Sequence, residues 1–196
     1  MTVILASKSA ARAAVLSGAG VPHEIHVAGV DEEAVKQGLL AEGASPRDVA
    51  DALAELKAVK VSRGREGFVI GADQTLEFEG RLYDKAPDLD GMRERLKAFR
   101  GKPHLLHSAV VVAKDGAPIW REVVSAKLTM RDFSDAFLED YIAAEGPSAL
   151  GSVGCYRLEG PGAQLFARIE GDYFTILGLP LMGLLDLFRL HKVIPA

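Results

Sequence analysis

The sequence predicts a single domain of the mixed α/β class, and two observations support this prediction. Short apolar runs typical of buried strands alternate with helical stretches, beginning with residues 3–6 and 10–16. Two β-rich stretches, 105–113 and 119–130, are separated by a short segment that contains Asp115-Gly116, a strong signal for a hairpin. Because a hairpin joins antiparallel strands, we expect a mixed sheet rather than an all-parallel one.

The first strand leads into the first helix through Ser7-Lys8-Ser9. Ser9 is typical of a helix N-cap, and Gly18 and Gly20 are of the type that ends helices. A strand, a small polar turn and a helix N-terminus can bind an anion, because the first backbone N–H groups of a helix have no partner inside it. Ordinary strand-to-helix turns have the same order, so shape alone leaves both interpretations open.

The remaining elements follow from the same kinds of signal. The apolar run 68–72 predicts a buried strand that ends at Asp73, and Ser45-Pro46 predicts the cap and first residue of a helix. In chain order we expect a strand at 23–27, a helix at 45–63, strands at 68–72 and 75–78, a turn at 79–80, a helix at 89–99, the two hairpin strands, a helix at 134–144, short strands near 155–158, 164–168 and 174–177, and a last helix at 180–190.

Composition limits the class of protein. The chain has 196 residues, of which 48% are apolar and 26% charged, and these values are typical of one globular domain. The net charge of −4 excludes a general nucleic-acid binder, although a few local cations could still hold a small anion. The one cysteine, Cys155, excludes a disulfide framework and a Cys-rich metal site.

No segment indicates export or a membrane partner. The longest apolar stretch, 174–190, is interrupted by Gly, Pro and Asp. The N-terminal residues 1–16 lack the apolar core and the cleavage site of a secretory signal. We therefore expect a cytoplasmic protein with neither a nucleic-acid nor a membrane partner.

Asp73 is the most informative single residue. It follows Val69-Ile70-Gly71-Ala72 directly, and α/β proteins place catalytic groups at the carboxyl ends of buried strands. Gly71 would allow a backbone or a ligand to come close. Asp73 could act as a metal ligand or as a general base on water, and the structural alternative is an Asp that caps the next turn.

Several other charged residues gain meaning only if the fold brings them to Asp73. Asp31-Glu32-Glu33 is an acidic run of the kind that usually faces solvent, and Lys57 and Lys85 are ordinary surface residues when each is taken alone. Two lysines and Arg12 beside two carboxylates, however, would form a site for a triphosphate and a divalent metal. The absence of G-x-x-x-x-G-K-[ST], and of G-x-G-x-x-G after a strand, argues against a P-loop enzyme and a dinucleotide-binding fold.

A series of short blocks runs along almost the whole chain in a specific order. In sequence they are Leu5-Ala6-Ser7-Lys8-Ser9-Ala10-Ala11-Arg12, Val30-Asp31-Glu32, Leu56-Lys57-Ala58, Ile70-Gly71-Ala72-Asp73, Asp84-Lys85, Gly101-Lys102-Pro103-His104 with Ser108, Gly154-Cys155-Tyr156, and Ile169-Glu170-Gly171-Asp172-Tyr173 with Gly178-Leu179-Pro180-Leu181. Each block is a weak signal by itself. Together, their order and spacing resemble the Maf family of nucleoside triphosphate pyrophosphatases.

This resemblance implies a fold, a reaction and a set of site residues. The fold would be an α/β structure with two lobes around a central cleft, and a homodimer is expected because members of the family are often homodimers. The reaction would cleave a nucleoside triphosphate between its α- and β-phosphates, giving a monophosphate and pyrophosphate, with a divalent metal cation (Mg²⁺ or Mn²⁺) as cofactor. Asp73 would activate water, Glu32 and Asp73 would hold the metal, and the substrate-binding residues would be Ser7, Arg12, Lys57 and Lys85.

Three positions bear on which nucleotide base is preferred. Gln74 and Glu159 stand where the branch acting on dTTP and UTP has Thr and Gln, and they resemble the branch that prefers 7-methyl-GTP. That branch carries Trp at the position of Ala11, so the match is partial. Glu159 could instead be a loop carboxylate that points to solvent.

Two further departures from the family pattern leave an alternative function open. Ala11 replaces the first Arg of the family's N-terminal motif, and Ser152 stands where many members have Lys. If these losses removed catalysis, the chain would be a catalytically weak nucleotide-binding regulator of cell division or septum formation. The matching Asp73, Glu32 and lysines favour the enzyme.

Overall fold

The structure is a computed structural model that describes residues 2–195. Its elements, in chain order, are β1 (Val3–Leu5), α1 (Ala10–Gly18), β2 (Glu24–Ile25), α2 (Glu32–Ala41), α3 (Pro46–Ser62), β3 (Phe68–Phe78), β4 (Arg81–Tyr83), α4 (Leu89–Phe99), β5 (Pro103–Lys114), β6 (Ala117–Met130), α5 (Asp135–Ala149), the 3₁₀ helix η1 (Pro161–Leu165), β7 (Phe166–Glu170), α6 (Tyr173–Ile176) and α7 (Leu181–Leu190). The strands pair in the order β2-β1-β3-β5-β6-β7, and β4 pairs with β3. β1 is parallel to β2 and β3, whereas β4 and β7 pair antiparallel, so the predicted mixed α/β class is confirmed.

Two compact units make up the described chain. Unit 1 comprises residues 2–74, 107–124 and 173–195, and unit 2 comprises residues 75–106 and 125–172. The long strands β3, β5 and β6 contribute residues to both units. Neither unit therefore corresponds to one continuous segment of the sequence.

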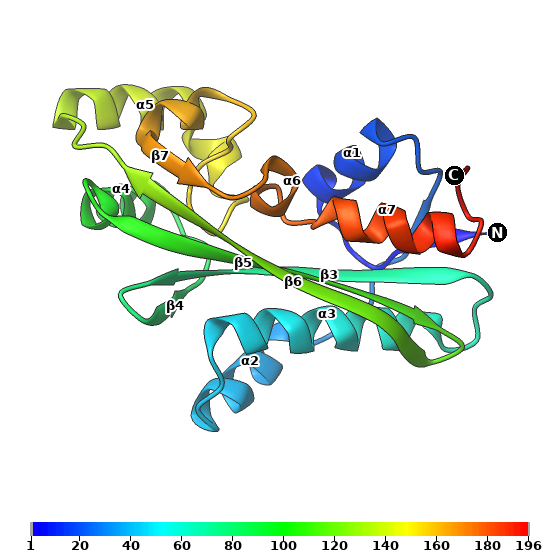
Figure 1. Ribbon diagram of the computed structural model, residues 1–196. Helices are drawn as coiled ribbons and strands as arrows, with labels where there is room; N and C mark the ends of the chain where they lie inside the picture. Colours follow the sequence, from blue (N-terminus) through cyan, green and yellow to red (C-terminus); the bar gives the residue numbers. More distant parts are fainter. Residues whose placement is uncertain (1, 196) are drawn as a thin grey trace. The chain divides into compact units, whose positions relative to one another are not determined.

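In unit 1, the strand β5 is buried on both faces. In β5, Val110 and Val112 belong to an apolar cluster with residues of α1 and α7, while Ala109, Val111 and Ala113 pack with alanines of α3. Because successive side chains of a strand point to opposite faces, this alternation places α3 on one face and both α1 and α7 on the other (Figure 1). A strand covered on both faces has no polar side to expose, which explains the continuous apolar run in its sequence.

Both predicted two-residue turns are present. β3 turns into β4 at Glu79-Gly80, with φ of 50° and 75°, and β5 turns into β6 at Asp115-Gly116, with φ of 52° and 81°. Positive φ at both central residues is what a type I′ turn requires, and the twist of that turn matches the twist of the paired strands.

The helices begin where the sequence predicts caps. The Ser9 hydroxyl accepts a hydrogen bond from the backbone of Arg12 at the start of α1. Ser45 and Asp48 form a capping box at the start of α3, and Pro46 takes the first helical position. These side chains satisfy N–H groups that a helix leaves without internal partners, and this local chemistry is visible in the sequence.

Four local predictions are wrong. β3 does not end at Asp73 but continues as one strand to Phe78. Residues 155–158 form no strand, because Cys155 has a φ of 59°, outside the extended region. Residues 164–165 belong to η1, so β7 begins only at Phe166. The predicted strand at 174–177 is instead the helix α6 and its end, since a short apolar run does not distinguish a buried helix turn from a strand.

Unit 2 contains an aromatic cluster around His104. This imidazole is 2% exposed, stacks on the ring of Phe99 with 5.1 Å between centroids, and has its Nε2 2.6 Å from the hydroxyl of Tyr156. Phe166 packs against both His104 and Tyr156.

No helix within residues 2–195 combines the length and the apolar character needed to cross a membrane.

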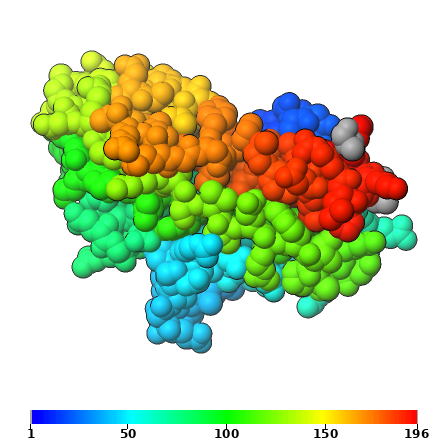
Figure 2. Space-filling view, in the orientation of Figure 1, coloured from blue at the N-terminus to red at the C-terminus, as the bar shows by residue number. Residues whose placement is uncertain are grey.

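α2 is the least buried of the described helices, because none of its residues is buried. In the space-filling view its residues, coloured between blue and cyan, stand out at the surface (Figure 2). The segment before it is tied to α3 by a hydrogen bond of 2.7 Å from Lys60 Nζ to the carbonyl of Gly29. The helix is therefore held by polar contacts and by a partly buried face that packs against α3, rather than by fully buried apolar residues.

Candidate active site

Asp73 lies inside β3, beside the point where the parallel strand β1 ends. The two strands pair up to Leu5 and Ile70, and the backbone of Ala6 donates to Ile70 O over 2.7 Å. Beyond this point β3 continues, while the chain of β1 leaves the sheet into the turn at Ser7. Asp73 of β3 thus lies beside the carboxyl end of the neighbouring parallel strand, β1. The carboxyl ends of parallel strands are where α/β proteins bind ligands.

Gly71 explains how α3 reaches Asp73. A Cβ atom added at Gly71 would overlap backbone atoms of Ala54 and Ala58 in α3. The helix therefore packs directly on the backbone of the strand, which is the close approach expected at this glycine. Lys57 lies between these two alanines in the sequence, and its side chain extends along the strand to Asp73.

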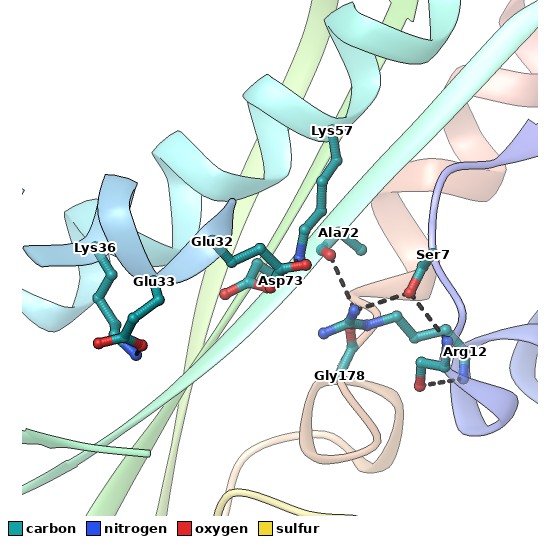
Figure 3. A network of polar contacts seen from close by, with 10 residues as sticks. Ser7, Arg12, Glu32, Glu33, Lys36, Lys57, Ala72, Asp73 and Gly178 are labelled. Atoms are coloured by element: carbon teal, nitrogen blue, oxygen red, sulfur yellow. Dashed lines mark hydrogen bonds and ion pairs between the residues drawn. The ribbon is translucent and has the colours of Figure 1, made fainter. Parts of the chain in front are cut away.

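The ammonium group of Lys57 joins the two predicted carboxylates (Figure 3). Its Nζ lies 2.7 Å from Asp73 Oδ1 and 2.9 Å from Glu32 Oε2. Lys57 and Asp73 are buried, being 6% and 8% exposed, whereas the side chain of Glu32 is 49% exposed. The fold thus gives Lys57, which sequence alone leaves as a surface residue, a buried place between two acids.

The three residues of the acidic run have different roles. Asp31 caps α2 by accepting a hydrogen bond from the backbone of Ala34. Glu33 pairs with Lys36 and Gln37 of its own helix. Only Glu32 contacts Lys57, so one carboxylate of the run, and not the whole run, belongs to the site.

Arg12 is anchored on one side and retains donors on the other. Its Nε donates to the carbonyl of Gly178 over 2.8 Å, and its Nη1 donates to the carbonyl of Ala72 over 2.9 Å and to Ser7 Oγ over 3.1 Å. Within residues 2–195, the Nη2 of Arg12 donates no hydrogen bond. The two N–H groups of this nitrogen are therefore available to an anion. This geometry supports the interpretation of the Ser7 turn and the α1 N-terminus as an anion site.

The charges of these residues shift one another's pKa values. Burial raises the pKa of Asp73, the cations Lys57 and Arg12 oppose that shift, and Glu32 adds to it. Burial likewise lowers the pKa of Arg12, against the attraction of Asp73 and Glu32. A buried carboxylate with a raised pKa is a stronger base than an exposed one, while the adjacent cations favour its charged form.

Gln74, the next residue of β3, is held by residues that sequence analysis does not identify as site residues. Its Nε2 donates to Ser108 Oγ over 2.8 Å and to the carbonyls of Thr175 and Ile176 over 3.1 and 3.0 Å. Because backbone carbonyls only accept hydrogen bonds, the amide nitrogen must face them, and Oε1 is the atom left for a ligand. One signal in the sequence could have indicated this contact. Gly178 is typical of a residue that ends a helix, and it argues against the strand predicted at 174–177.

The remaining predicted residues lie elsewhere. Ala11 is a half-buried residue of α1. Lys85 and Glu159 belong to unit 2, where both are exposed. The structure thus brings five predicted residues together within unit 1, namely Ser7, Arg12, Glu32, Lys57 and Asp73. The roles of Lys85 and Glu159 stay predictions.

The two carboxylates are suited to a divalent metal that is shared with a substrate. Within residues 2–195, no group of three or more His, Cys, Asp or Glu side chains is placed to hold a metal ion. Asp73 and Glu32, however, converge on one cation, the Lys57 ammonium. Mg²⁺ in nucleotide enzymes commonly takes one or two carboxylates and completes its shell with water and phosphate oxygens. This donor set therefore fits Mg²⁺ or Mn²⁺ bound together with a triphosphate.

Comparison with known proteins shows the family to which the chain belongs. The family model described as Maf-like protein matches residues 2–191. The chain belongs to the Maf-like family. Its Maf-like relatives include a nucleoside triphosphate pyrophosphatase of Caulobacter vibrioides, which is 65% identical over 96% of this chain and 95% of its own length. Another with the same name, from Granulibacter bethesdensis, is 54% identical over 99% of both chains.

Some Maf-like relatives are named for a more specific activity, the hydrolysis of 7-methyl-GTP. A 7-methyl-GTP pyrophosphatase of Brucella suis is 49% identical to this chain over 99% of both chains. The resemblance inferred from the short sequence blocks is therefore confirmed at the level of the family, and of the two branches considered for the base, the one acting on 7-methyl-GTP is named among these relatives.

Proposed function

We propose that this protein hydrolyses nucleoside triphosphates at the bond between the α- and β-phosphates, releasing a nucleoside monophosphate and pyrophosphate. The observation that carries this proposal is the Asp73 carboxylate, buried beside Lys57 and Arg12 in a Maf-like chain. A base, two cations and a second carboxylate are what such a reaction needs around a polyanionic substrate. The names of the relatives support the same activity.

Asp73 acts as the general base. Its Oδ1 is held by Lys57, whereas its Oδ2 contacts no partner found within residues 2–195, so Oδ2 accepts the proton of the attacking water. The water oxygen bonds to the α-phosphorus as the bond from that phosphorus to the bridging oxygen breaks, and pyrophosphate leaves. The raised pKa of Asp73 helps this transfer, because a stronger base is more effective at neutral pH.

The cations stabilise the charge that develops on the phosphates. The free Nη2 donors of Arg12 and the start of α1 bind phosphate oxygens, and Ser7 keeps the guanidinium in place. Lys57 holds Asp73 and Glu32 in position. Lys85 of unit 2 is proposed to add a further cation toward the pyrophosphate.

Glu32 and Asp73 are the residues that would hold the divalent metal. When bound, the metal would neutralise phosphate charge and polarise the phosphorus that is attacked. The half-exposed Glu32 leaves one side of the pair open to solvent and so to an incoming metal–nucleotide complex.

For the base, we propose a preference for 7-methyl-GTP. Because the amide nitrogen of Gln74 is saturated, its Oε1 can only accept, and guanine offers N–H donors. Glu159 is exposed, and its neighbour Arg157 pairs with Glu145 instead at 2.8 Å, so the Glu159 carboxylate is available to the positive charge of a methylated ring. Ala11 offers no aromatic face to that ring, so any cation–π contribution must come from elsewhere.

The test is steady-state turnover of 7-methyl-GTP, GTP, dTTP and UTP with Mn²⁺, with pyrophosphate and phosphate measured separately. We expect pyrophosphate as the first product, the highest kcat/KM for 7-methyl-GTP, and no turnover with EDTA. In Glu159→Gln the preference for 7-methyl-GTP over GTP should fall about tenfold, since a charge-assisted hydrogen bond becomes a neutral one. The control is Glu66→Gln, an exposed residue of unit 1.

Two outcomes contradict different parts of the proposal. If dTTP and UTP are the better substrates, the base preference is wrong and the pyrophosphatase activity stands. If no triphosphate is hydrolysed, the enzymatic function is wrong, and the nucleotide-binding regulator becomes the better interpretation.

A further inference from the structure

The short helix α6 ends in a turn whose geometry is fully specified. Leu179 N donates to Phe174 O and Gly178 N donates to Thr175 O, over 3.1 and 3.0 Å. With Gly178 at a φ of 90°, this is the Schellman arrangement, in which a glycine in the left-handed region ends the helix. Leu179, which follows, is fully buried in the core of unit 1, so the turn is fixed to that core.

Three carbonyl oxygens of this turn hold site side chains from distant parts of the sequence. Thr175 O and Ile176 O accept hydrogen bonds from the amide of Gln74, and Gly178 O accepts one from Nε of Arg12. The carbonyls at the end of a helix have acceptor capacity left over, and Thr175 O, which already accepts from Gly178 N, can accept a further donor through its second lone pair.

Ser108 strengthens the same contact from β5. This serine is fully buried, and its hydroxyl donates to Thr175 O over 2.6 Å while accepting from Gln74 Nε2 over 2.8 Å. The hydroxyl thus links the α6 turn to Gln74 a second time, and neither group can turn without breaking this bridge.

The two anchored side chains flank Asp73 in the sequence and in space. Arg12, held by Gly178, donates to the carbonyl of Ala72, the residue before Asp73. Gln74, the residue after Asp73, is held by the α6 turn and Ser108. A displacement of the turn would therefore move the supports on both sides of the Asp73 carboxylate.

A side chain at Gly178 would press on Arg12. A Cβ atom at this position would lie 3.3 Å from Arg12 Nε, a tight contact, and 3.5 Å from Arg12 Nη2 and 3.7 Å from Gln74 Cδ, which are ordinary van der Waals distances. The glycine is favoured by the positive φ of the turn, and a larger residue would also have to displace the Arg12 side chain by a few tenths of an ångström.

We propose that Gly178 and Ser108 are positioning residues, which set Arg12 and Gln74 beside Asp73 without touching the substrate. The expected effect on catalysis rests on the proposed function. The positioning of Arg12 and Gln74 by the α6 turn rests on contacts within unit 1 alone. Under this proposal, phosphate binding by Arg12 depends on the α6 turn as well as on the residues that contact phosphate.

The first test compares Gly178→Ala with Gly43→Ala. Gly43 has a φ of 84° and no atom within 4 Å of an added Cβ, so it carries the same backbone strain without the contact to Arg12. We expect both variants to lose similar thermal stability. In Gly178→Ala alone, kcat/KM for 7-methyl-GTP and GTP should fall about tenfold to hundredfold, because small misplacements of binding groups have effects of that size. The inhibition constant of added pyrophosphate should rise in parallel.

A second readout does not depend on turnover. The hydrogen bond from Arg12 Nε to Gly178 O should protect that N–H from exchange with solvent, and its NMR signal can be assigned with Arg12→Lys. We expect exchange about tenfold faster in Gly178→Ala and unchanged in Gly43→Ala. If both activity and exchange in Gly178→Ala match Gly43→Ala, the positioning role is wrong.

A milder pair of variants covers the case in which Gly178→Ala does not fold. Ser108→Ala removes the bridging hydroxyl, and Ser62→Ala removes another fully buried hydroxyl of unit 1 that donates to a carbonyl, at Val59. Reduced kcat/KM in Ser108→Ala but not in Ser62→Ala supports the proposal, and equal kcat/KM in the two contradicts it. If the wild type hydrolyses no triphosphate, the proposed function fails, while the exchange rate at Arg12 still decides whether the turn holds that residue.

Discussion

Asp73 in unit 1 and His104 in unit 2 are both ionisable residues of the interior, 8% and 2% exposed. Burial acts on them in the same way, since it disfavours the charged form of each: it raises the pKa of Asp73 and lowers the pKa of His104 to about 4. Their neighbours differ. Asp73 has Lys57 at 2.7 Å and the charge of Arg12, whereas His104 has aromatic rings and the Tyr156 hydroxyl.

The difference shows that two side chains with a similar degree of burial can have opposite electrostatic surroundings in one fold. Partners of opposite charge keep Asp73 in a state that can accept a proton and bind a cation. Without such partners His104 stays neutral at physiological pH and serves packing, and no partner for its buried Nδ1 lies among residues 2–195. Burial alone therefore does not separate the candidate catalytic residue Asp73 from His104, whereas burial with compensating charge does.

The largest effect is expected when the charge of Asp73 is removed. Asp73→Asn keeps the size of the side chain but cannot accept the proton, so kcat should fall by roughly 10²–10⁴. Pyrophosphate release at saturating nucleotide and Mn²⁺ measures this, with circular dichroism as the control for folding. Near-normal turnover in Asp73→Asn would mean that the carboxylate is only structural.

Removing the partner instead of the acid should act on stability. Lys57→Met leaves Asp73 buried beside a neutral side chain and should lower the free energy of unfolding by about 3–5 kcal/mol. In the double variant Lys57→Met/Asp73→Asn, part of this loss should be recovered, because no unpaired buried charge is left. Urea unfolding of the four proteins of this cycle measures the coupling, and a double variant less stable than Lys57→Met contradicts it.

His104 should make the protein less stable in acid. The unfolded chain binds a proton below about pH 6.5, whereas the folded imidazole binds one only near pH 4. The free energy of unfolding therefore falls as the pH is lowered from about 6.5 to about 4, by up to about 3 kcal/mol from this residue. Urea unfolding at several pH values should show a shallower dependence of the free energy of unfolding on pH over this range in His104→Phe than in wild type.

The smallest effect on stability is expected at the exposed side of the site. Glu32→Gln should change the free energy of unfolding by less than about 1 kcal/mol, because its pair with Lys57 is half exposed. Mn²⁺ affinity, measured by electron paramagnetic resonance, should fall about tenfold if Glu32 is a ligand. The matched control is Glu33→Gln, since Glu33 pairs with Lys36 of its own helix. Equal Mn²⁺ affinity in the two variants would remove Glu32 from the metal site.

Local chemistry was determined by the sequence itself. The caps at Ser9 and Ser45, the turns at Glu79-Gly80 and Asp115-Gly116, and the bounds of α4 depend on neighbouring residues, whose geometry is the same in any fold. The ordered short blocks also sufficed to identify the Maf-like family. Asp73 could be singled out because a carboxylate after a continuous apolar run is unusual in a buried strand.

Only the tertiary structure decided which charged residues meet. Lys57 reaches Asp73 because Gly71 lets α3 pack on the backbone of β3, and apart from the family resemblance nothing in the sequence around Lys57 distinguishes it from a surface lysine. Likewise only the family resemblance separates Glu32 from Glu33 in the sequence, whereas the structure pairs Glu32 with Lys57 and Glu33 with Lys36. The helix at 173–176 was missed because a short apolar run does not distinguish a helix turn from a strand, and the contacts of its terminal turn with Gln74, Ser108 and Arg12 come from segments far away in the chain. Contacts between distant segments follow from packing over the whole core, and a pattern of neighbouring residues does not contain them.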